Sequence, residues 1–391
     1  MVKYILKRIL VMSALFLVFL SATWFLVELQ PGDPSQVYVG NPEIPPEAKQ
    51  IIIERFGLDQ PRGVRYLRYI TNFLHGDMGQ SSSQFPRQVW DLLKERIPRT
   101  LFLFIAATLM SYFVGFLTGK IVAWRRGSKT EQGMTIAGVA LYTVFYPWFA
   151  LVMIWLFSYT LGEVTGLRIF PLGGFIDQGE WPSTLGVQPN TIFIQLLFSA
   201  LLVVLCRVVG GILSRRVESR AAAKWVRRGS FLVPLALAVM FWWSSQYTAQ
   251  AVDLLQHLAL PTFTLTMVAF GGAMLLTRSS MLETLKEDYI LTARAKGVSE
   301  SDIRDNHAAR NALLPVTTSL VLALAFVIGG GVVTETVFSW PGLGQLELEA
   351  ILRGDIPLAL GGLTMIGVLA LLGHLIVDIL YMYLDPRIRY S

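Results

Sequence analysis

Eight long apolar runs constrain the fold of this chain more than any other feature of its sequence. They cover residues 9–29, 100–122, 133–160, 194–213, 230–249, 258–277, 313–335 and 360–382. A helix needs about 20 apolar residues to cross the hydrocarbon core of a bilayer. Only 15% of the residues are charged, whereas soluble domains have about 25%. We therefore predict an all-α, polytopic integral membrane protein with about eight spans.

The first run predicts a retained membrane span and not a cleaved signal peptide. Lys3, Lys7 and Arg8 precede it, as they would precede either kind of segment. The apolar core of a signal peptide is usually about 7–15 residues long and is followed by a small-residue cleavage site. This run is longer and ends in the sequence ELQP. Residues 1–29 are therefore expected to form the first span.

Basic residues orient the predicted spans. They gather at the N-terminus, in alternate connections and at the C-terminus: Arg125, Arg126 and Lys129; Arg215, Arg216, Arg220, Lys224, Arg227 and Arg228; Lys286, Arg294, Lys296, Arg304 and Arg310; Arg387 and Arg389. The other short connections, 161–193, 250–257 and 336–359, contain only Arg168 and Arg353. Short loops rich in Lys and Arg stay in the cytoplasm, so we predict that both termini are cytoplasmic.

Two of the runs leave an alternative open. Arg207 lies in the middle of 194–213, and Pro234 interrupts 230–249. A charge at the centre of the bilayer costs about 2.5–3.5 kcal/mol on insertion scales. These runs therefore form either a pair of spans or a hairpin that dips into the inner leaflet. The orientation of the other spans is the same in both cases.

Residues 30–99 are too polar to span and are expected to form an extracytoplasmic helical region. PPEAKQIIIERFGLD predicts a helix that begins at Pro45 or Pro46 and stops at Gly57, because Pro favours helix starts and Gly follows helix ends. RGVRYLRYITNFLHGD has apolar residues at helical spacing, and FPRQVWDLLKERIP predicts a third short helix. The region is either a structural cap or a docking surface for an outside partner.

A polar, helix-favouring stretch separates two apolar runs at residues 288–315, DYILTARAKGVSESDIRDNHAARNALLP. The pattern predicts a helix at 288–296 that runs on from the preceding span and ends at Gly297, a residue suited to a left-handed helix end. Ser299 followed by Asp302 predicts the N-terminus of a second helix. We expect a rigid helix–Gly–helix hairpin exposed to the cytoplasm.

This stretch resembles the coupling-loop signature of bacterial ABC-importer permeases: E-A-A, three residues, Gly, nine residues, Ile, one residue and Leu-Pro. The matching residues are Ala293, Ala295, Gly297, Leu314 and Pro315. Other segments are similar to the B-type permease of oligopeptide, dipeptide and nickel importers: LQPGDP (29–34), FGLDQP (56–61), GDMGQSS (76–82), RIPRTL (96–101), FPLGG (170–174), HLALP (257–261), TETVFSWPGLG (334–344), RGDIPLALG (353–361) and LDPRIR (384–389).

The resemblance implies the transmembrane fold of a type I ABC importer. The core would be residues 100–384, with a coupling loop at 280–312 and a cytoplasmic tail at 385–391. The family usually has a short segment between Gly174 and His257, where this chain has about 80 residues. An insertion at 175–256 would therefore add two helices to a six-span core, which gives eight.

The resemblance also implies function, partners and location. The chain would be a permease in the cell membrane of a prokaryote that forms half of a path for peptides or similar small solutes. Its partners would be a C-type permease, two ATPase subunits or domains and an extracytoplasmic solute-binding protein. The residues implied in ATPase coupling are Ala293, Ala295, Lys296, Gly297, Ser299, Ile303, Asn311 and Pro315. The residues implied near the gate or substrate path are Gly330, Glu335 and Trp340, the last also an expected interfacial anchor.

No enzymatic site is predicted in the chain itself. GFLTGK at 115–120 imitates a phosphate loop, but it is one residue short between the glycines and Ile121 follows the lysine. ATP and magnesium would bind partner subunits, and no cofactor, metal or nucleic acid is expected on this chain. A self-contained secondary transporter would show internal repeats and several ionisable groups within its spans, and an intramembrane enzyme would show a catalytic pair there. The sequence does not choose among peptides, nickel, sugars and opines as the solute.

Overall fold

The computed structural model describes residues 2–29, 46–56, 60–166, 169–182, 186–217, 219–327 and 331–384. The described part of the chain is all-α, apart from an isolated antiparallel bridge between Gln80 and Gln88. It divides into two compact units. Unit 1 comprises Met1–Met153 and Pro261–Ser391, and unit 2 comprises Ile154–Leu260. The predicted insertion at 175–256 lies within unit 2.

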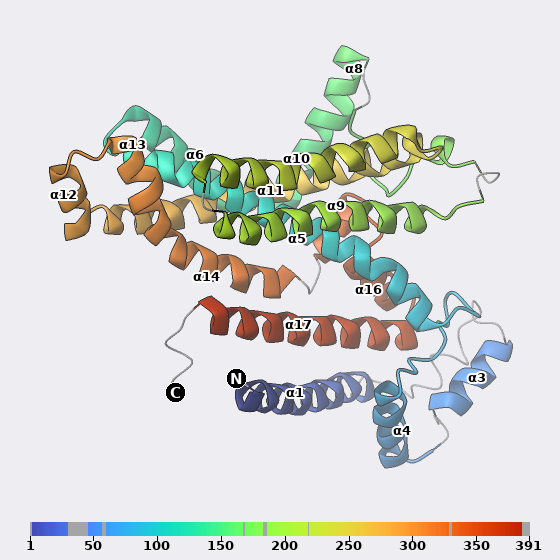
Figure 1. The fold of residues 1–391 in the computed structure, drawn as a ribbon. Helices are drawn as coiled ribbons and strands as arrows, with labels where there is room; N and C mark the ends of the chain where they lie inside the picture. Colours follow the sequence, from blue (N-terminus) through green and yellow to red (C-terminus); the bar gives the residue numbers. More distant parts are fainter. Residues whose placement is uncertain are drawn as a thin grey trace. The chain divides into compact units, whose positions relative to one another are not determined.

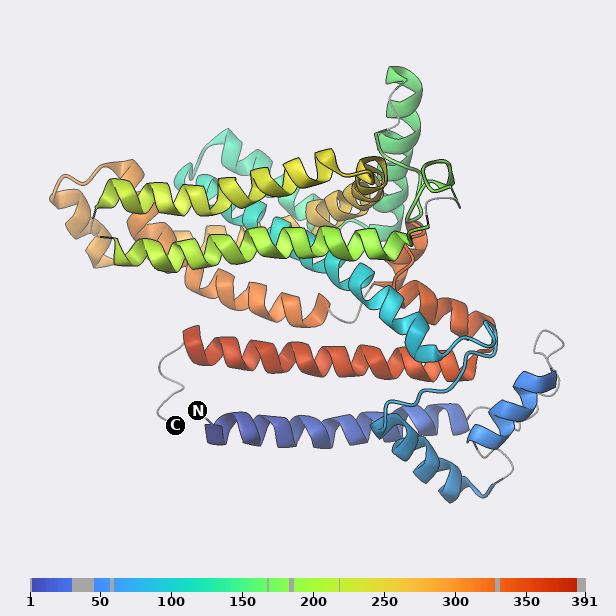
Figure 2. The same cartoon turned by 45° about the vertical axis from the view of Figure 1, so that its right-hand side comes forward.

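In unit 1, the first and last long helices lie side by side in both views (Figures 1 and 2). These are α1 (Val2–Glu28) and α17 (Ile356–Leu384), and Arg8 pairs with Asp378 across them at 3.1 Å. The predicted short helices are confirmed as α3 (Pro46–Phe56) and α4 (Arg62–Leu74). Buried residues of α1, α4, α5 (Val89–Trp124), α16 (Leu343–Leu352) and α17 form one apolar core, with Leu20, Tyr69, Leu93, Leu346 and Leu358 among them.

The predicted third short helix at 85–98 is wrong as a separate element. It is the first part of α5 (Val89–Trp124), which continues through Pro98. Val89, Leu92 and Leu93 are buried in the core that α5 shares with α16 and α17. This packing holds the helix together although Pro98 removes one backbone donor. At about 1.5 Å per residue, the 36 residues of α5 extend well beyond a bilayer core.

The predicted span at 133–160 is not one continuous helix, because the chain breaks within it, and the candidate span there begins only at Tyr146. Helix α6 (Lys129–Thr143) ends before α7 (Tyr146–Met153) begins, and Val144 between them is extended (φ −62°, ψ 142°). Pro147 explains the break, since its ring would clash with the carbonyl of Thr143 in a continuous helix. The π-helical segment η1 (Ile154–Thr160) and α8 (Leu161–Thr165) follow α7 in the chain.

Residues 250–257 form no loop, contrary to prediction. They belong to α11 (Thr248–Thr284), a 37-residue helix that contains Pro261. From Pro261 onward α11 belongs to unit 1, where it packs closely against α5. A Cβ added at Gly115 would lie 2.6 Å from the Cβ of Ala273. Small residues allow such close approach between membrane helices.

In unit 2, α9 (Pro189–Leu213) and α10 (Arg220–Ser244) form an antiparallel helical hairpin (Figure 2). The short 3-10 segments η2 (Gln178–Glu180) and η4 (Ser214–Arg216) precede and follow α9. The two long helices are in direct contact where Gly210 meets Ser230. Trp242 Nε1 also donates to Ser199 Oγ at 3.2 Å.

Six described helices are long and apolar enough to cross a membrane. They are Leu6–Leu26, Val89–Trp124, Tyr146–Thr165, Pro189–Leu213, Thr248–Thr284 and Ile356–Ile379. The predicted count of eight is therefore not confirmed. Two predicted spans have no counterpart in this set. Most of 230–249 lies in α10, which begins with several basic residues, and most of 313–335 lies in or beyond α14 (Ala309–Val327).

Candidate coupling site

The candidate coupling site is the hairpin at residues 288–315, which lies in unit 1 at the end of α5 opposite Val89. Its first helix, α12 (Asp288–Ala295), does not run on from the preceding span as predicted. Helix α11 ends at Thr284, and Glu287 is extended (φ −70°, ψ 142°). The turn between them places Ile290, which is fully buried, in a small apolar core.

The helix–Gly–helix geometry is confirmed. Gly297 has φ +75°, and a Cβ added there would meet no atom within 4 Å. Ser299 Oγ accepts from the backbone N–H of Asp302 at 3.3 Å and so caps α13 (Glu300–Asp302). The π-helical segment η5 (Ile303–Ala308) joins α13 to α14. Across the turn, Arg294 pairs with Glu300 at 3.0 Å.

The predicted coupling residues divide into buried and exposed groups. Ala293 and Ile303 are buried beside Ala123 of α5 and Met281 of α11. The other six are exposed: Ala295, Lys296, Gly297, Ser299, Asn311 and Pro315. The buried pair therefore anchors the hairpin to two long helices, and the exposed residues around Gly297 form its tip.

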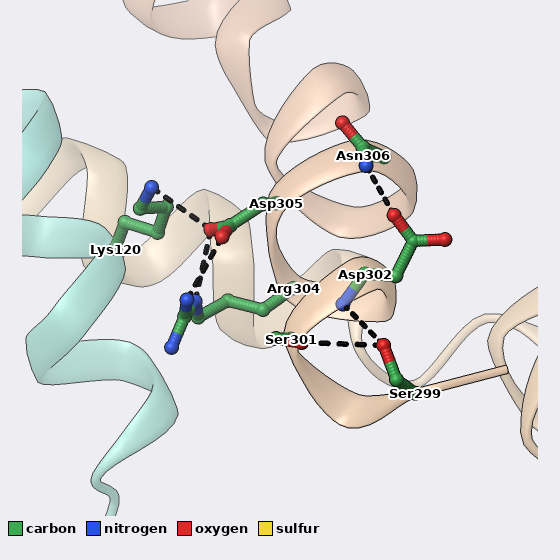
Figure 3. Close-up of polar contacts among 7 residues, drawn as sticks. All are labelled: Lys120, Ser299, Ser301, Asp302, Arg304, Asp305 and Asn306. Atoms are coloured by element: carbon green, nitrogen blue, oxygen red, sulfur yellow. Dashed lines mark hydrogen bonds and ion pairs between the residues drawn. The ribbon is translucent and has the colours of Figure 1, made fainter.

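Two polar contacts that tie this hairpin together were not predicted. Asn311 Nδ2 donates to the hydroxyl of Tyr289 at 2.7 Å and joins α14 to α12. Asp305 accepts from Arg304 at 2.8 and 2.9 Å and pairs with Lys120 of α5 at 2.9 Å (Figure 3). The Arg304 hydrogen bonds, followed by the Lys120 pair, hold the pKa of Asp305 well below its usual range.

Lys120 was considered in the sequence only as the lysine of an imperfect phosphate loop. The structure pairs its ammonium with Asp305 and therefore gives it a role in attaching the hairpin. Arg304 also lies over the ring of Trp124, with its guanidinium carbon 6.0 Å from the ring centroid, within the usual range of a cation–π contact. The adjacent opposite charges of Arg304 and Asp305 were the only feature of the sequence that pointed to an ion pair between them.

At the other end of α5, distant sequence segments meet in a buried polar cluster, the Glu335 lock. Glu335, on α15 (Val332–Val337), accepts from Thr100 Oγ1 at 2.7 Å and from the backbone N–H of Gln345 at 2.9 Å. Thr100 Oγ1 in turn accepts from the N–H of Leu343 at 2.7 Å. The segments 96–101 and 334–344, found separately in the sequence, are thus joined through one carboxylate.

Trp340 is not an exposed interfacial anchor in this chain, contrary to that expectation. It is fully buried, and its indole N–H donates to the carbonyl of Arg99 at 3.3 Å. Its backbone N–H donates to the carbonyl of Glu335 at 2.7 Å, which makes it part of the same lock. The other predicted gate residue, Gly330, lies outside the described residues.

A second lock joins the segments 76–82 and 353–361. Asp355 is fully buried and accepts from the Ser81 hydroxyl at 2.5 Å and the Ser83 hydroxyl at 2.7 Å. It also caps α17, since its other oxygen accepts from the N–H of Leu358 at 3.1 Å. The Glu335 lock fixes α15 and the start of α16 to α5, and the Asp355 lock fixes a loop to the start of α17.

Unit 2 has its own polar cluster at the start of α11. Asp253 accepts from the indole N–H of Trp181 at 2.7 Å and from the N–H of Asp177 at 3.1 Å, and it pairs with His257 at 3.1 Å. Asp177, Asp253 and His257 line a cavity of about 830 Å³. The cluster fastens the connection that precedes α9 to α11.

Comparison with known proteins decides what kind of chain carries this hairpin. Residues 111–390 match the family described as binding-protein-dependent transport system inner membrane component, and residues 1–104 match the N-terminal model of the same membrane component. The chain belongs to this family of permeases. It is therefore a multi-pass membrane component of a binding-protein-dependent transport system, and not its ATPase.

Full-length relatives agree with this assignment. The permease is 33% identical over 391 residues to the di/tripeptide transport system permease protein DppB of Pseudomonas aeruginosa. It is 32% identical over 396 residues to the dipeptide transport system permease protein DppB of Escherichia coli, and 30% identical over 390 residues to the oligopeptide transport system permease protein AppB of Bacillus subtilis. In each case the match covers all of both chains.

Proposed function

We propose that this permease forms half of the translocation path of an ATP-driven importer for short peptides. The observation that carries the substrate class is the naming of its full-length relatives, which are described as di/tripeptide, dipeptide and oligopeptide permeases. An extracytoplasmic binding protein delivers the peptide. ATP and magnesium bind separate ATPase subunits, and a C-type permease supplies the other half of the path.

The tip of the hairpin transmits ATPase motion to the spans. Ala295, Lys296, Gly297 and Ser299 are exposed there and form the surface that contacts the ATPase. Ala293 and Ile303 connect the tip to the inner ends of α5 and α11 through the shared core. Asn311 and Pro315 lie in the first two turns of α14, and Asn311 holds α14 to α12 through the hydroxyl of Tyr289. An element with few internal degrees of freedom passes displacement on to the helices that hold it, as coupling between sites requires.

We further propose eight spans with both termini in the cytoplasm and residues 30–99 outside. In this topology α10 crosses beside α9, and α14 completes a span. The clustering of basic residues in alternate connections supports it. The insertion at 175–256 supplies the additional pair. Glu335 and Trp340 fix the outer segment, and these two residues belong to the gate together with Gly330.

Peptide uptake by cells that lack other peptide importers tests the proposed function. Cells that express the permease with its partner subunits should accumulate a radiolabelled dipeptide, and cells that lack only this permease should not. Accumulation that is equal with and without the permease would reject the proposal. Uptake of nickel or a sugar, but no peptide, would leave the permease assignment intact and reject the substrate class.

Cysteine labelling from outside the cell tests the topology. Cys206 is the single cysteine of the chain and can be replaced by serine. In that background, an impermeant maleimide should label Gln178→Cys in intact cells, and it should label Arg216→Cys only after lysis. Labelling of Arg216→Cys in intact cells would contradict the eight-span topology.

A further inference from the structure

The α9–α10 hairpin has a basic cavity at the end where the two helices are connected. We call it the hairpin cavity. Its volume is about 830 Å³. The lining residues are Arg207 and Ser214 from the α9 side and Ala223, Lys224, Arg227, Arg228, Phe231 and Leu232 from α10. Four of the eight are cationic, and no described carboxylate lines the cavity.

This segment carries the excess positive charge of the whole protein. Residues 207–228 include seven basic residues and one acidic residue, Glu218. The chain has 33 basic and 27 acidic residues, so 26 of each remain when this segment is set aside. The net charge of this segment therefore attracts an anionic ligand.

Arg207 shows that the cavity is built into the end of the helix. Helix α9 ends at Leu213, so Arg207 lies about 9 Å from its end at 1.5 Å per residue. Its guanidinium extends along the last turns of the helix to Gly211, where an added Cβ would lie 3.4 Å from Nη1. Long basic side chains near helix ends extend toward the aqueous interface in this way.

Apart from Ser214, the remaining lining residues are apolar, and with the surrounding side chains they suit an acyl chain. Phe231 and Leu232 line the cavity on the side of α10 that leads into the span, and both are exposed. The flanking faces carry further exposed apolar side chains: Val204, Val208, Ile212, Leu235 and Val239. Next to Lys224, Trp225 is 73% exposed, and tryptophan is enriched where membrane and water meet.

We propose that the hairpin cavity binds the phosphate headgroup of an anionic phospholipid of the inner leaflet. Arg207, Lys224, Arg227 and Arg228 surround the phosphate, and the acyl chains lie along Phe231 and Leu232. Basic pockets between membrane helices on the cytoplasmic side recognise such headgroups. The inference rests on the topology proposed above, which places this end of the hairpin in the cytoplasm. It does not depend on which solute is transported.

Lipid retention by the full-length permease tests this site. The detergent-solubilised chain is titrated with phosphatidylglycerol and, separately, with phosphatidylcholine, and bound lipid is counted by native mass spectrometry. Phosphatidylglycerol should bind at least about tenfold more tightly, and the double variant Arg227→Gln/Arg228→Gln should weaken it by about 30-fold, since each basic residue near a headgroup contributes about fivefold. Lys224→Gln alone should weaken it by about fivefold.

Arg216→Gln provides the matched control. Arg216 belongs to the same connection and is exposed, but it does not line the cavity. Its variant should retain phosphatidylglycerol as the unmodified chain does. Equal losses in the control and the cavity variants would overturn the proposal in favour of diffuse attraction. Displacement of the lipid by an equal concentration of inorganic phosphate would overturn it in favour of a free-phosphate site, and the labelling of Arg216→Cys reports separately on the topology.

Discussion

The coupling hairpin and the connected end of the α9–α10 hairpin are both rich in basic residues, yet they use them differently. The coupling hairpin, residues 288–315, contains four basic and four acidic residues, and residues 207–228 contain seven basic residues and one acidic residue. In the first region Arg294 pairs with Glu300, and Lys120 and Arg304 pair with Asp305. In the second, four cations line a cavity without a described carboxylate.

The two regions show that a basic connection between helices has two physical uses. Where acids are interspersed, the charges satisfy one another and fix the shape of an exposed element. Where acids are scarce, the charges remain available to an external anion, and the local shape depends on apolar contacts between the helices. The first arrangement suits the transmission of motion, and the second suits the binding of a membrane lipid.

Replacement of Gly297 tests most strongly whether shape is what the coupling hairpin contributes. Gly297→Val places a β-branched residue at φ +75°, where an L-residue is strained by about 1–2 kcal/mol or more. Because no atom lies within 4 Å of the added Cβ, the effect is backbone strain and not a clash. We expect peptide uptake and peptide-stimulated ATP hydrolysis to fall about tenfold or more, with membrane abundance nearly normal.

Gly127→Val is the matched control for this substitution. Gly127 has φ +84° and equally open surroundings, but it lies in the connection between α5 and α6. Its variant should carry the same backbone strain and retain uptake. Full transport by the Gly297→Val permease would show that the geometry of the hairpin tip does not couple ATP hydrolysis to transport.

Asp305→Asn should have the next largest effect, because it removes the charge that Lys120 and Arg304 share. The two cations would then face each other with only an amide between them. Asp305 is partly exposed, so we expect a loss of about 0.5–1 kcal/mol in the attachment of the hairpin and a reduction of uptake by about two- to fivefold. The double variant Lys120→Gln/Asp305→Asn should recover part of that loss. Uptake by the double variant that is lower than that of Asp305→Asn would contradict the pairing.

The same ion pair predicts a smaller, pH-dependent effect. The folded pKa of Asp305 is lowered by Arg304 and Lys120, so its stabilising contribution is complete above the unfolded pKa, about 3.9, and is lost as the pH falls toward the folded pKa. At pH 6 to 7 the amides of residues 299–310 should therefore be better protected from hydrogen exchange in the unmodified permease than in the Asp305→Asn variant. This difference in protection should shrink below about pH 4. A difference that stays constant down to pH 3 would exclude the carboxylate as its source.

Helix identity could be predicted well in this chain, whereas helix ends could not. Two of the errors involve prolines. Pro98 was expected to end a short helix but lies inside α5. Pro261 lies inside α11, as it lies inside the predicted span 258–277. Pro147, inside a predicted span, marks the start of α7. In membrane helices, neighbouring segments satisfy the backbone group that proline leaves free, so packing and not local sequence decides which prolines break a helix.

In the coupling hairpin, the local features were predictable and the long-range contacts were not. The helix end at Gly297 and the helix start at Ser299 were both predicted correctly. Each depends on the residue itself, because glycine adopts positive φ and a serine hydroxyl accepts from a free backbone N–H. The Lys120–Asp305 pair and the Thr100–Glu335 bond join residues 185 and 235 positions apart. No local pattern encodes such pairs, and the burial of Ala293 and Ile303 depends on the same packing.

Arg228→Gln is expected to have the smallest effect, and its sign should depend on lipid. Lys224 and Arg228 are four residues apart on α10, and like charges at this spacing destabilise a helix by about 0.2–0.5 kcal/mol. In a zwitterionic detergent without added lipid, the variant should therefore unfold at a slightly higher temperature than the unmodified permease.

Phosphatidylglycerol should reverse the order of the two unfolding temperatures, because a ligand that binds the folded state stabilises most the chain that binds it most tightly. Thermal unfolding with and without the lipid measures both values, and Arg216→Gln should show no such reversal. An Arg228→Gln permease that is less stable in both conditions would mean that its guanidinium has a structural partner, and the contrast between paired and available charge would then fail at this position.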